Sequence, residues 1–210
     1  MKALLHPTYF PDIATFATIV QHDVEWEVKD NYQKQTYRNR CYIATDFGRH
    51  LLSIPISHVG RKEGRQKYED VQLDNSYSWQ RQHWRTLQTA YRTSPFFEFY
   101  EDDIAPLFEN EFDLLLDYNL KTIETVVDCL QIEMPQAKSQ KFERSPQDIQ
   151  DARFLVNAKK NPLLEQATYV QVFGDRHGFI KNCSILDLLF NEGTNALGYL
   201  QNLNLPFLNA

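Results

Sequence analysis

The first 28 residues carry the pattern that most restricts the fold. A run over 2–6 reads as a short strand, and two prolines after it, Pro7 and Pro11, prevent regular hydrogen bonding between them. Apolar residues then recur at helical spacing, which predicts an amphipathic helix over 11–21. Because Val24–Val28 alternates as a strand, the segment is compatible with a right-handed parallel crossover, and we expect an α/β or α+β fold.

In such a unit the loop after the first strand lies at the carboxyl edge of the sheet, where ligands usually bind. His6 and Tyr9 lie in that loop, and Asp30 follows the second strand, so we expect the three to lie close together. Asp30 is a candidate catalytic carboxylate, and His6 is a candidate base or phosphate ligand. The alternatives are a structural carboxylate and a histidine bonded to the backbone of the turn.

The rest of the chain predicts a hairpin and then helices. We expect a single domain over 1–210, with a small mixed sheet and a β-hairpin in the part over 1–75 and a largely helical part over 76–210. The individual expectations are a hairpin over 41–56 with Gly48 at its turn, a mobile loop over 59–67, a short strand over 70–74, helices over 76–91, 104–108, 112–130 and 185–190, a polar loop or lid over 135–160, a strand over 167–173 and a turn over 174–179.

Motifs and cysteines exclude several classes of protein. The chain has no glycine-rich dinucleotide loop, no Walker loop, no His-Glu-x-x-His and no Gly-x-Ser-x-Gly, which argues against the enzymes that use them. It has no run of about 18 apolar residues and no signal peptide, so we expect no membrane span. The three widely spaced cysteines predict reduced thiols in a cytoplasmic protein and argue against a zinc site.

Charge is unevenly distributed along the chain. Residues 29–92 hold 12 basic and 6 acidic side chains, a net charge of +6, whereas the remaining residues hold 10 basic and 22 acidic ones, a net charge of −12. The acidic remainder would repel a phosphate backbone, so we expect no binding of nucleic acid. A local site for a small anionic substrate agrees better with this distribution.

The polar segment Lys29–Arg40 is the expected binding segment. If its end is a strand, Arg38 and Arg40 lie on one face and can form a fork for carboxylate or phosphate oxygens. Asn39 and Lys34 are further candidate substrate contacts. The alternatives are an arginine paired with a carboxylate for structural reasons and a solvated lysine.

His83 and Tyr9 complete the set of candidate substrate contacts. His83 belongs to the apolar stripe of the helix over 76–91, where a histidine is more often a satisfied, half-buried residue than a ligand. Spacing defines no pair of carboxylates, no pair of nucleophile and base and no metal cluster, and the sequence leaves any cofactor unassigned. The sequence therefore predicts a site without assigning a reaction.

Four segments together resemble the WbqC-like protein family in their order and spacing. They are the turn over 6–11, the segment from Asp30 through Gln33 to Arg38, Asn39 and Arg40, the helix with Trp79 and His83 that runs to Tyr91, and the end over 186–193. The similarity covers nearly the whole chain. Family members commonly begin the turn with Gln-Pro, where this chain has His6-Pro7, and often have a longer glycine-rich stretch where this chain has only 174–179.

This bacterial family is often encoded with surface-polysaccharide genes, and some members are described as transferases. The resemblance implies a cytoplasmic transferase, acyl or aminoacyl in type, that acts on an anionic sugar or sugar-nucleotide precursor. Arg38 and Arg40 would hold the anion, and Asp30 or His6 would take a proton. The alternative is a non-catalytic binding or scaffold protein of the same pathway, whose basic segment docks an acidic partner.

Overall fold

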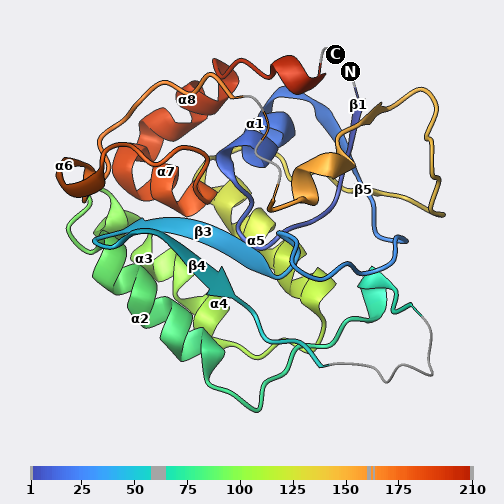
Figure 1. Cartoon of the computed structure of the whole chain (residues 1–210), viewed down its shortest axis with the longest axis horizontal. Coiled ribbons are helices and arrows are strands. Elements are labelled where there is room, and N and C mark those ends of the chain that lie inside the picture. The colour runs from blue at the N-terminus through green and yellow to red at the C-terminus, as the bar shows by residue number, and fades with distance from the viewer. Residues whose placement is uncertain (1, 58–64, 160–161, 163, 209–210) are drawn as a thin grey trace.

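A four-stranded parallel sheet forms one side of the computed structural model, which describes residues 2–57, 65–159, 162 and 164–208. Its strands are β1 (Lys2–Leu5), β2 (Asp23–Trp26), β5 (Ala137–Lys138) and β6 (Gln150–Asp151), in the order β5-β2-β1-β6. Helix α1 (Ile13–Gln21) connects β1 to β2, and these two strands pair in parallel (Figure 1). The expected parallel strand–helix–strand unit is therefore confirmed.

The alternation of side chains along β1 and β2 explains how the sheet packs. Leu5 is paired with Trp26 in the register of the two strands, and both side chains belong to the hydrophobic core. The neighbouring pair, Leu4 and Glu25, points to the opposite face because successive side chains of a strand alternate. The carboxylate of Asp12 caps α1 by accepting the backbone N–H of Thr15 at 2.9 Å.

A separate antiparallel hairpin joins β3 (Arg40–Thr45) to β4 (Gly48–Ser53), as expected. Gly48 has a φ of +92°, a backbone conformation that suits glycine at a tight turn. In Figure 1 the hairpin lies between α7 (Ile185–Glu192) and α2 (Trp79–Tyr91).

The remaining helices confirm that the C-terminal half is largely helical. They are α3 (Phe97–Ile104), α4 (Pro106–Glu109), α5 (Leu115–Cys129), α6 (Gly174–His177) and α8 (Ala196–Gln201), with 3-10 turns at Tyr68–Asp70, Arg153–Val156, Gly193–Asn195 and Pro206–Leu208. One core cluster joins buried side chains from α1, α2, α5 and α7. None of the described helices is long and apolar enough to cross a membrane.

Two strands of the sheet come from 135–160, where the sequence predicts only a loop. Strands β5 and β6 have two residues each and pair with β2 and β1, respectively. Two residues are too few to show the alternation by which a strand is recognised in a sequence, and these strands are defined only by pairing with a neighbour. The sheet expected in the N-terminal half is therefore completed by two short strands from the C-terminal half.

Three shorter expectations also differ from the structure. Instead of a strand over 70–74, Asp70 ends a 3-10 turn, and two isolated bridges follow, from Gln72 to Leu114 and from Leu73 to Ile56. Residues 167–173 have no ladder partner among the described residues, and the chain over 174–177 turns into α6. Most of the predicted mobile loop over 59–67 lies outside the described residues.

Candidate active site at the carboxyl edge of the sheet

All four strands of the parallel sheet end at the same edge. His6 follows β1, Glu27 follows β2, Ser139 follows β5, and Arg153 lies two residues after β6. Polar side chains from distant parts of the chain therefore meet where parallel sheets usually bind ligands.

Arg38 connects the two candidate catalytic residues through one nitrogen. Its Nη2 lies 3.0 Å from Oδ2 of Asp30 and 2.9 Å from Nε2 of His6. Nε2 of His6 is also 3.3 Å from the same Asp30 oxygen. The structure thus brings His6, Asp30 and Arg38 together at the edge of the sheet.

The hydrogen bonds of His6 define its protonation state. A guanidinium can only donate, so Nε2 of His6 accepts from Arg38 and Nδ1 faces the carbonyl oxygen of Glu27 at 3.2 Å as the donor. Burial lowers the pKa of His6 to about 4. The positive charge of Arg38 also lowers this pKa, whereas the Asp30 carboxylate acts to raise it. The imidazole is therefore neutral at pH 7.

Asp30 is ionised in this arrangement. Burial acts to raise its pKa, but the contact with His6, the Arg38 charge and the backbone N–H of Asn31 outweigh burial and hold the pKa below its usual value. The Asn31 N–H donates to Oδ1 at 2.6 Å. Oδ2 therefore accepts from Arg38 as a negatively charged oxygen, and it lies 3.3 Å from Nε2 of His6.

The Arg38 side chain is fully buried and only partly paired. Its Nε and Nη1 have no hydrogen-bond partner among the described residues. Its guanidinium carbon lies 5.2 Å from the centre of the Tyr68 ring, and burial lowers its pKa. A buried guanidinium with unpaired N–H groups is costly, so its presence calls for an explanation such as a catalytic role or a bound ion.

His6, Asp30 and Arg38 line a cavity of about 350 Å³. Its other walls carry a second ion pair, two phenylalanines, two amides and a valine: Gln33, Phe142, Asp151, Arg153, Phe154, Val156 and Asn157. Phe142 and Phe154 are 43% and 44% exposed, so each keeps part of its ring open to solvent. We call this the catalytic-edge cavity.

Arg153 is a central residue of this cavity that the sequence does not indicate. Its Nε and Nη2 bind the two carboxylate oxygens of Asp151 at 2.8 and 2.6 Å. Its Nη1 donates to the carbonyl oxygen of Glu143 at 2.8 Å and lies 3.5 Å from the Glu27 carboxylate. The only sequence signal is an Asp-x-Arg before an apolar run, which is too common to be noticed.

Comparison with known proteins identifies the family. The model of the WbqC-like protein family matches residues 6–162, about three quarters of the chain. The chain belongs to the WbqC-like protein family. It is also similar to the uncharacterized protein Rv1507c of Mycobacterium tuberculosis, with 25% identity over 230 residues that cover 95% of this chain and 96% of that protein. No solved structure matches the chain.

The family match confirms the resemblance seen in the sequence and includes every residue that lines the catalytic-edge cavity. Among the described residues of this WbqC-like chain, no group of three or more histidine, cysteine, aspartate or glutamate side chains could hold a metal ion.

Arg40, Lys34 and Asn39 lie together, but in another cavity of about 270 Å³. Tyr37 and Arg38 form a turn, and the strand begins only at Arg40. The alternation of a strand therefore does not apply to these residues, and Arg38 and Arg40 line different cavities.

Tyr9 and His83 lie together in the core, so the expectation that Tyr9 lies beside Asp30 is wrong. Tyr9 Oη is 2.9 Å from Nδ1 of His83, and their rings pack with those of Trp79 and Tyr118. Both residues are buried, and burial lowers the pKa of His83 to about 4. Of the turn over 6–11, only His6 lines the catalytic-edge cavity.

Proposed function

We propose that this WbqC-like chain is a cytoplasmic transferase, acyl or aminoacyl in type, that acts on an anionic sugar or sugar-nucleotide precursor in surface-polysaccharide biosynthesis. The observation that carries the proposal is the arrangement of a neutral imidazole, a carboxylate and a buried guanidinium around one cavity at the carboxyl edge of a parallel sheet.

Two guanidinium groups support an anionic substrate. Arg38 has N–H groups without a partner among the described residues. Arg153 brings a second positive charge to the same cavity, and its own N–H groups donate to Asp151, Glu143, Arg144 and Glu27. Guanidinium groups match the oxygens of phosphates and carboxylates in geometry and charge. The partly exposed rings of Phe142 and Phe154 offer flat apolar surface to a sugar or a base.

The pair of His6 and Asp30 supports proton transfer. A hydroxyl or amine of the acceptor would attack the carbonyl carbon of the donor and lose its proton to this pair. To take that proton, Nε2 of His6 would give up the hydrogen bond that it accepts from Arg38. The imidazolium formed would face the Asp30 carboxylate, whose Oδ2 lies 3.3 Å from Nε2. The leaving group would then take the proton as it departs.

The lining of the cavity favours direct transfer over a covalent enzyme intermediate. The described lining residues include no serine, threonine, cysteine or lysine. These are the side chains that most often act as nucleophiles in acyl transfer. We therefore propose that the acceptor attacks the donor directly while both are bound.

A non-catalytic binding or scaffold protein is the second candidate. It is favoured by the pairing of each charged lining residue with an opposite charge, Asp30 with Arg38 and Asp151 with Arg153. Such a cavity can recognise a ligand without any proton transfer.

A turnover assay separates the two candidates. Sugar nucleotides would be incubated with acyl and aminoacyl donors, and products would be followed by mass spectrometry. For the transferase, Asp30→Asn and His6→Gln should each reduce turnover at least about 100-fold while the sugar nucleotide still binds. Binding without turnover in the unmodified chain would favour the non-catalytic protein, and failure to bind any sugar nucleotide would contradict the transferase.

A further inference from the structure

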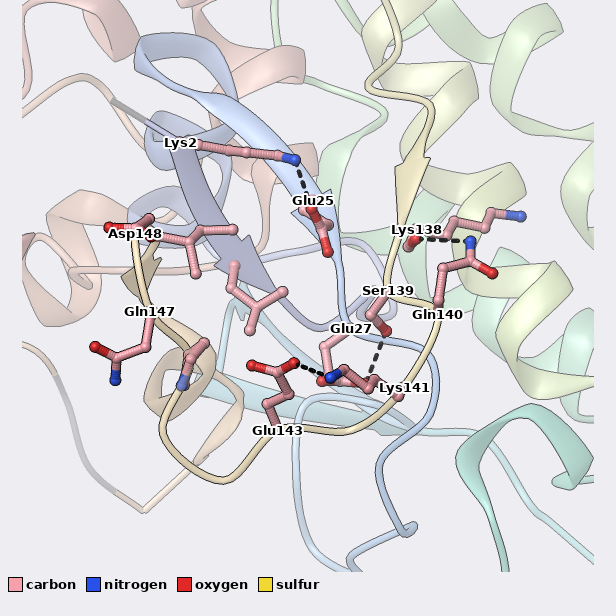
Figure 2. A pocket seen from close by; sticks show the side chains of 13 residues that line it. Lys2, Glu25, Glu27, Lys138, Ser139, Gln140, Lys141, Glu143, Gln147 and Asp148 are labelled. Atoms are coloured by element: carbon pink, nitrogen blue, oxygen red, sulfur yellow. Dashed lines mark hydrogen bonds and ion pairs between the residues drawn. The ribbon is translucent and has the colours of Figure 1, made fainter.

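A second cavity lies over the open face of the parallel sheet. Residues 139–149, which we call the strap, connect β5 at one edge of the sheet to β6 at the other and so cross its face. Parallel strands are usually connected through a helix that covers the sheet, but the strap contains no helix. Figure 2 shows the strap curving around side chains that rise from the strands.

The space under the strap has a volume of about 440 Å³. Its floor is formed by Lys2 and Leu4 of β1, Glu25 of β2 and Glu27 just after it. Its other walls come from Lys138 and the strap: Ser139, Gln140, Lys141, Glu143, Pro146, Gln147, Asp148 and Ile149. We call this the strap cavity.

Opposite charges are paired inside the strap cavity. Lys2 pairs with Glu25, and Lys141 Nζ lies 2.9 Å from a carboxylate oxygen of Glu143 (Figure 2). The lining holds three lysines and four carboxylates, and Arg153 lies against one of these carboxylates, that of Glu27. A ligand with a large net charge would therefore gain little here.

Glu27 gives the strap cavity a buried acceptor. Its side chain is fully buried, and Oε1 accepts from the backbone N–H of Lys29 at 2.8 Å and from Ser139 Oγ at 3.0 Å. Within the part of the chain that the structure describes, Oε2 has only the 3.5 Å contact with Arg153. This oxygen can still accept a strong hydrogen bond, because a carboxylate oxygen has two lone pairs.

We propose that the strap cavity binds a neutral, polyhydroxylated compound, a sugar unit. Hydroxyl groups both donate and accept hydrogen bonds, so they can bind to ammonium, carboxylate and amide groups that are already paired with one another. A ligand with a net charge would gain little from such paired groups. Leu4, Pro146 and Ile149 supply apolar surface for the C–H groups of a sugar ring. A hydrocarbon ligand would leave this polar lining without partners.

Arg153 links this site to the catalytic-edge cavity. It lines that cavity while its Nη1 donates to Glu143 and contacts Glu27, which both line the strap cavity. The two cavities are therefore neighbours, because a side chain that lines one of them contacts two residues that line the other. The sugar site goes beyond the proposed transfer reaction and stands whether or not transfer occurs.

Saturation-transfer NMR with glucose, galactose and N-acetylglucosamine tests the sugar site. We expect at least one of these sugars to receive saturation from the chain, and Glu27→Gln to weaken its affinity about tenfold, because a bond to a charged acceptor is lost. Asp148→Asn should weaken it severalfold. Asn tolerates the positive φ of this exposed strap residue, so the second variant keeps the test valid if the first fails to fold.

The matched control is Glu98→Gln, an exposed carboxylate on α3 away from both cavities, which should bind the sugar as the unmodified chain does. No saturation of any neutral sugar by the unmodified chain would overturn the proposal. The proposal would also be overturned if both Glu27→Gln and Asp148→Asn bound the sugar with the affinity of the unmodified chain. Saturation transfer to glucose 1-phosphate but to no neutral sugar would overturn it as well.

Discussion

At the residue scale, the catalytic-edge cavity depends on how one nitrogen of Arg38 is shared. Nη2 has two hydrogens and donates one to Asp30 and the other to His6. This pairing keeps His6 in its neutral form with Nδ1 protonated, and it keeps Asp30 ionised. The protonation states follow from geometry and burial together.

The burial of His6 predicts a pH dependence of stability. The unfolded histidine takes up a proton near pH 6.5, whereas the folded one stays neutral down to a pKa of about 4. The unfolded state thus binds more protons in this window, so the contribution of His6 to stability is lost as the pH falls from about 6.5 to 4. From pH 7 to pH 5 the loss is about 2 kcal/mol.

Urea unfolding of the unmodified chain and His6→Gln at pH 7 and pH 5 measures this effect. The difference between the two pH values should be smaller in the variant by about 2 kcal/mol. The same pH dependence in both chains would show that His6 is not buried in its neutral form.

Tyr9 is predicted to act through stability. In Tyr9→Phe, Nδ1 of the buried His83 loses its partner, which should lower the free energy of unfolding by about 1–3 kcal/mol. The exposed Tyr77 provides the control, because Tyr77→Phe should change stability by less than about 0.5 kcal/mol. Equal stability of both variants in urea would contradict the buried Tyr9–His83 pair.

The sequence identifies part of the site for a physical reason. His6 and Asp30 follow two strands of a recognisable strand–helix–strand unit, so topology alone predicts that they meet. The sequence indicates Arg38 because residues 37–40 resemble the start of a strand, but Arg38 lies in a turn. Arg153 could not be found, because its place depends on β6, a strand of two residues.

At the element scale, long periodic segments were predictable and short paired ones were not. Helices α1, α2, α5 and α7 bury regular apolar stripes, and their positions follow from periodicity. The segment over 167–173 has strand-like composition, but its polar side chains bind a helix. Tyr169 and Gln171 donate to the buried carboxylate of Asp187 on α7 at 2.5 and 2.7 Å.

Alanine at Gly193, which follows α7, and alanine at Gly198 should have very different effects on stability. The φ of Gly193 is +53°, and a Cβ there would lie 2.4 Å from the Phe96 ring. Gly193→Ala should therefore cost about 3 kcal/mol through backbone strain and overpacking. Gly198 in α8 has open space at its Cβ, so Gly198→Ala should be neutral or stabilise by up to about 1 kcal/mol.

Thermal or urea unfolding of the two glycine variants provides the comparison. A Gly193→Ala chain as stable as Gly198→Ala would contradict the close packing of α7 against Phe96.

At the scale of the whole molecule, the fold brings together residues that are far apart in the sequence. The catalytic-edge cavity takes His6 from the end of β1, Asp30 and Arg38 from the polar segment, and Asp151 and Arg153 from β6 and the turn after it. Counting charges along the chain indicates a basic segment, but the folded cavity pairs each of its arginines with an aspartate. Local recognition, and not net charge, is therefore the basis of the proposed function.

The central claim is that the catalytic-edge cavity binds an anionic sugar-type substrate. Isothermal titration of the unmodified chain, Arg153→Gln and the control Arg81→Ala with a panel of UDP-, GDP- and dTDP-sugars tests it most directly. Arg153 lines the cavity, whereas Arg81 is an exposed residue of α2. We predict that a sugar nucleotide binds the unmodified chain and Arg81→Ala equally, and binds Arg153→Gln at least about tenfold more weakly. Equal affinity of all three proteins, or no binding by any of them, would contradict the claim.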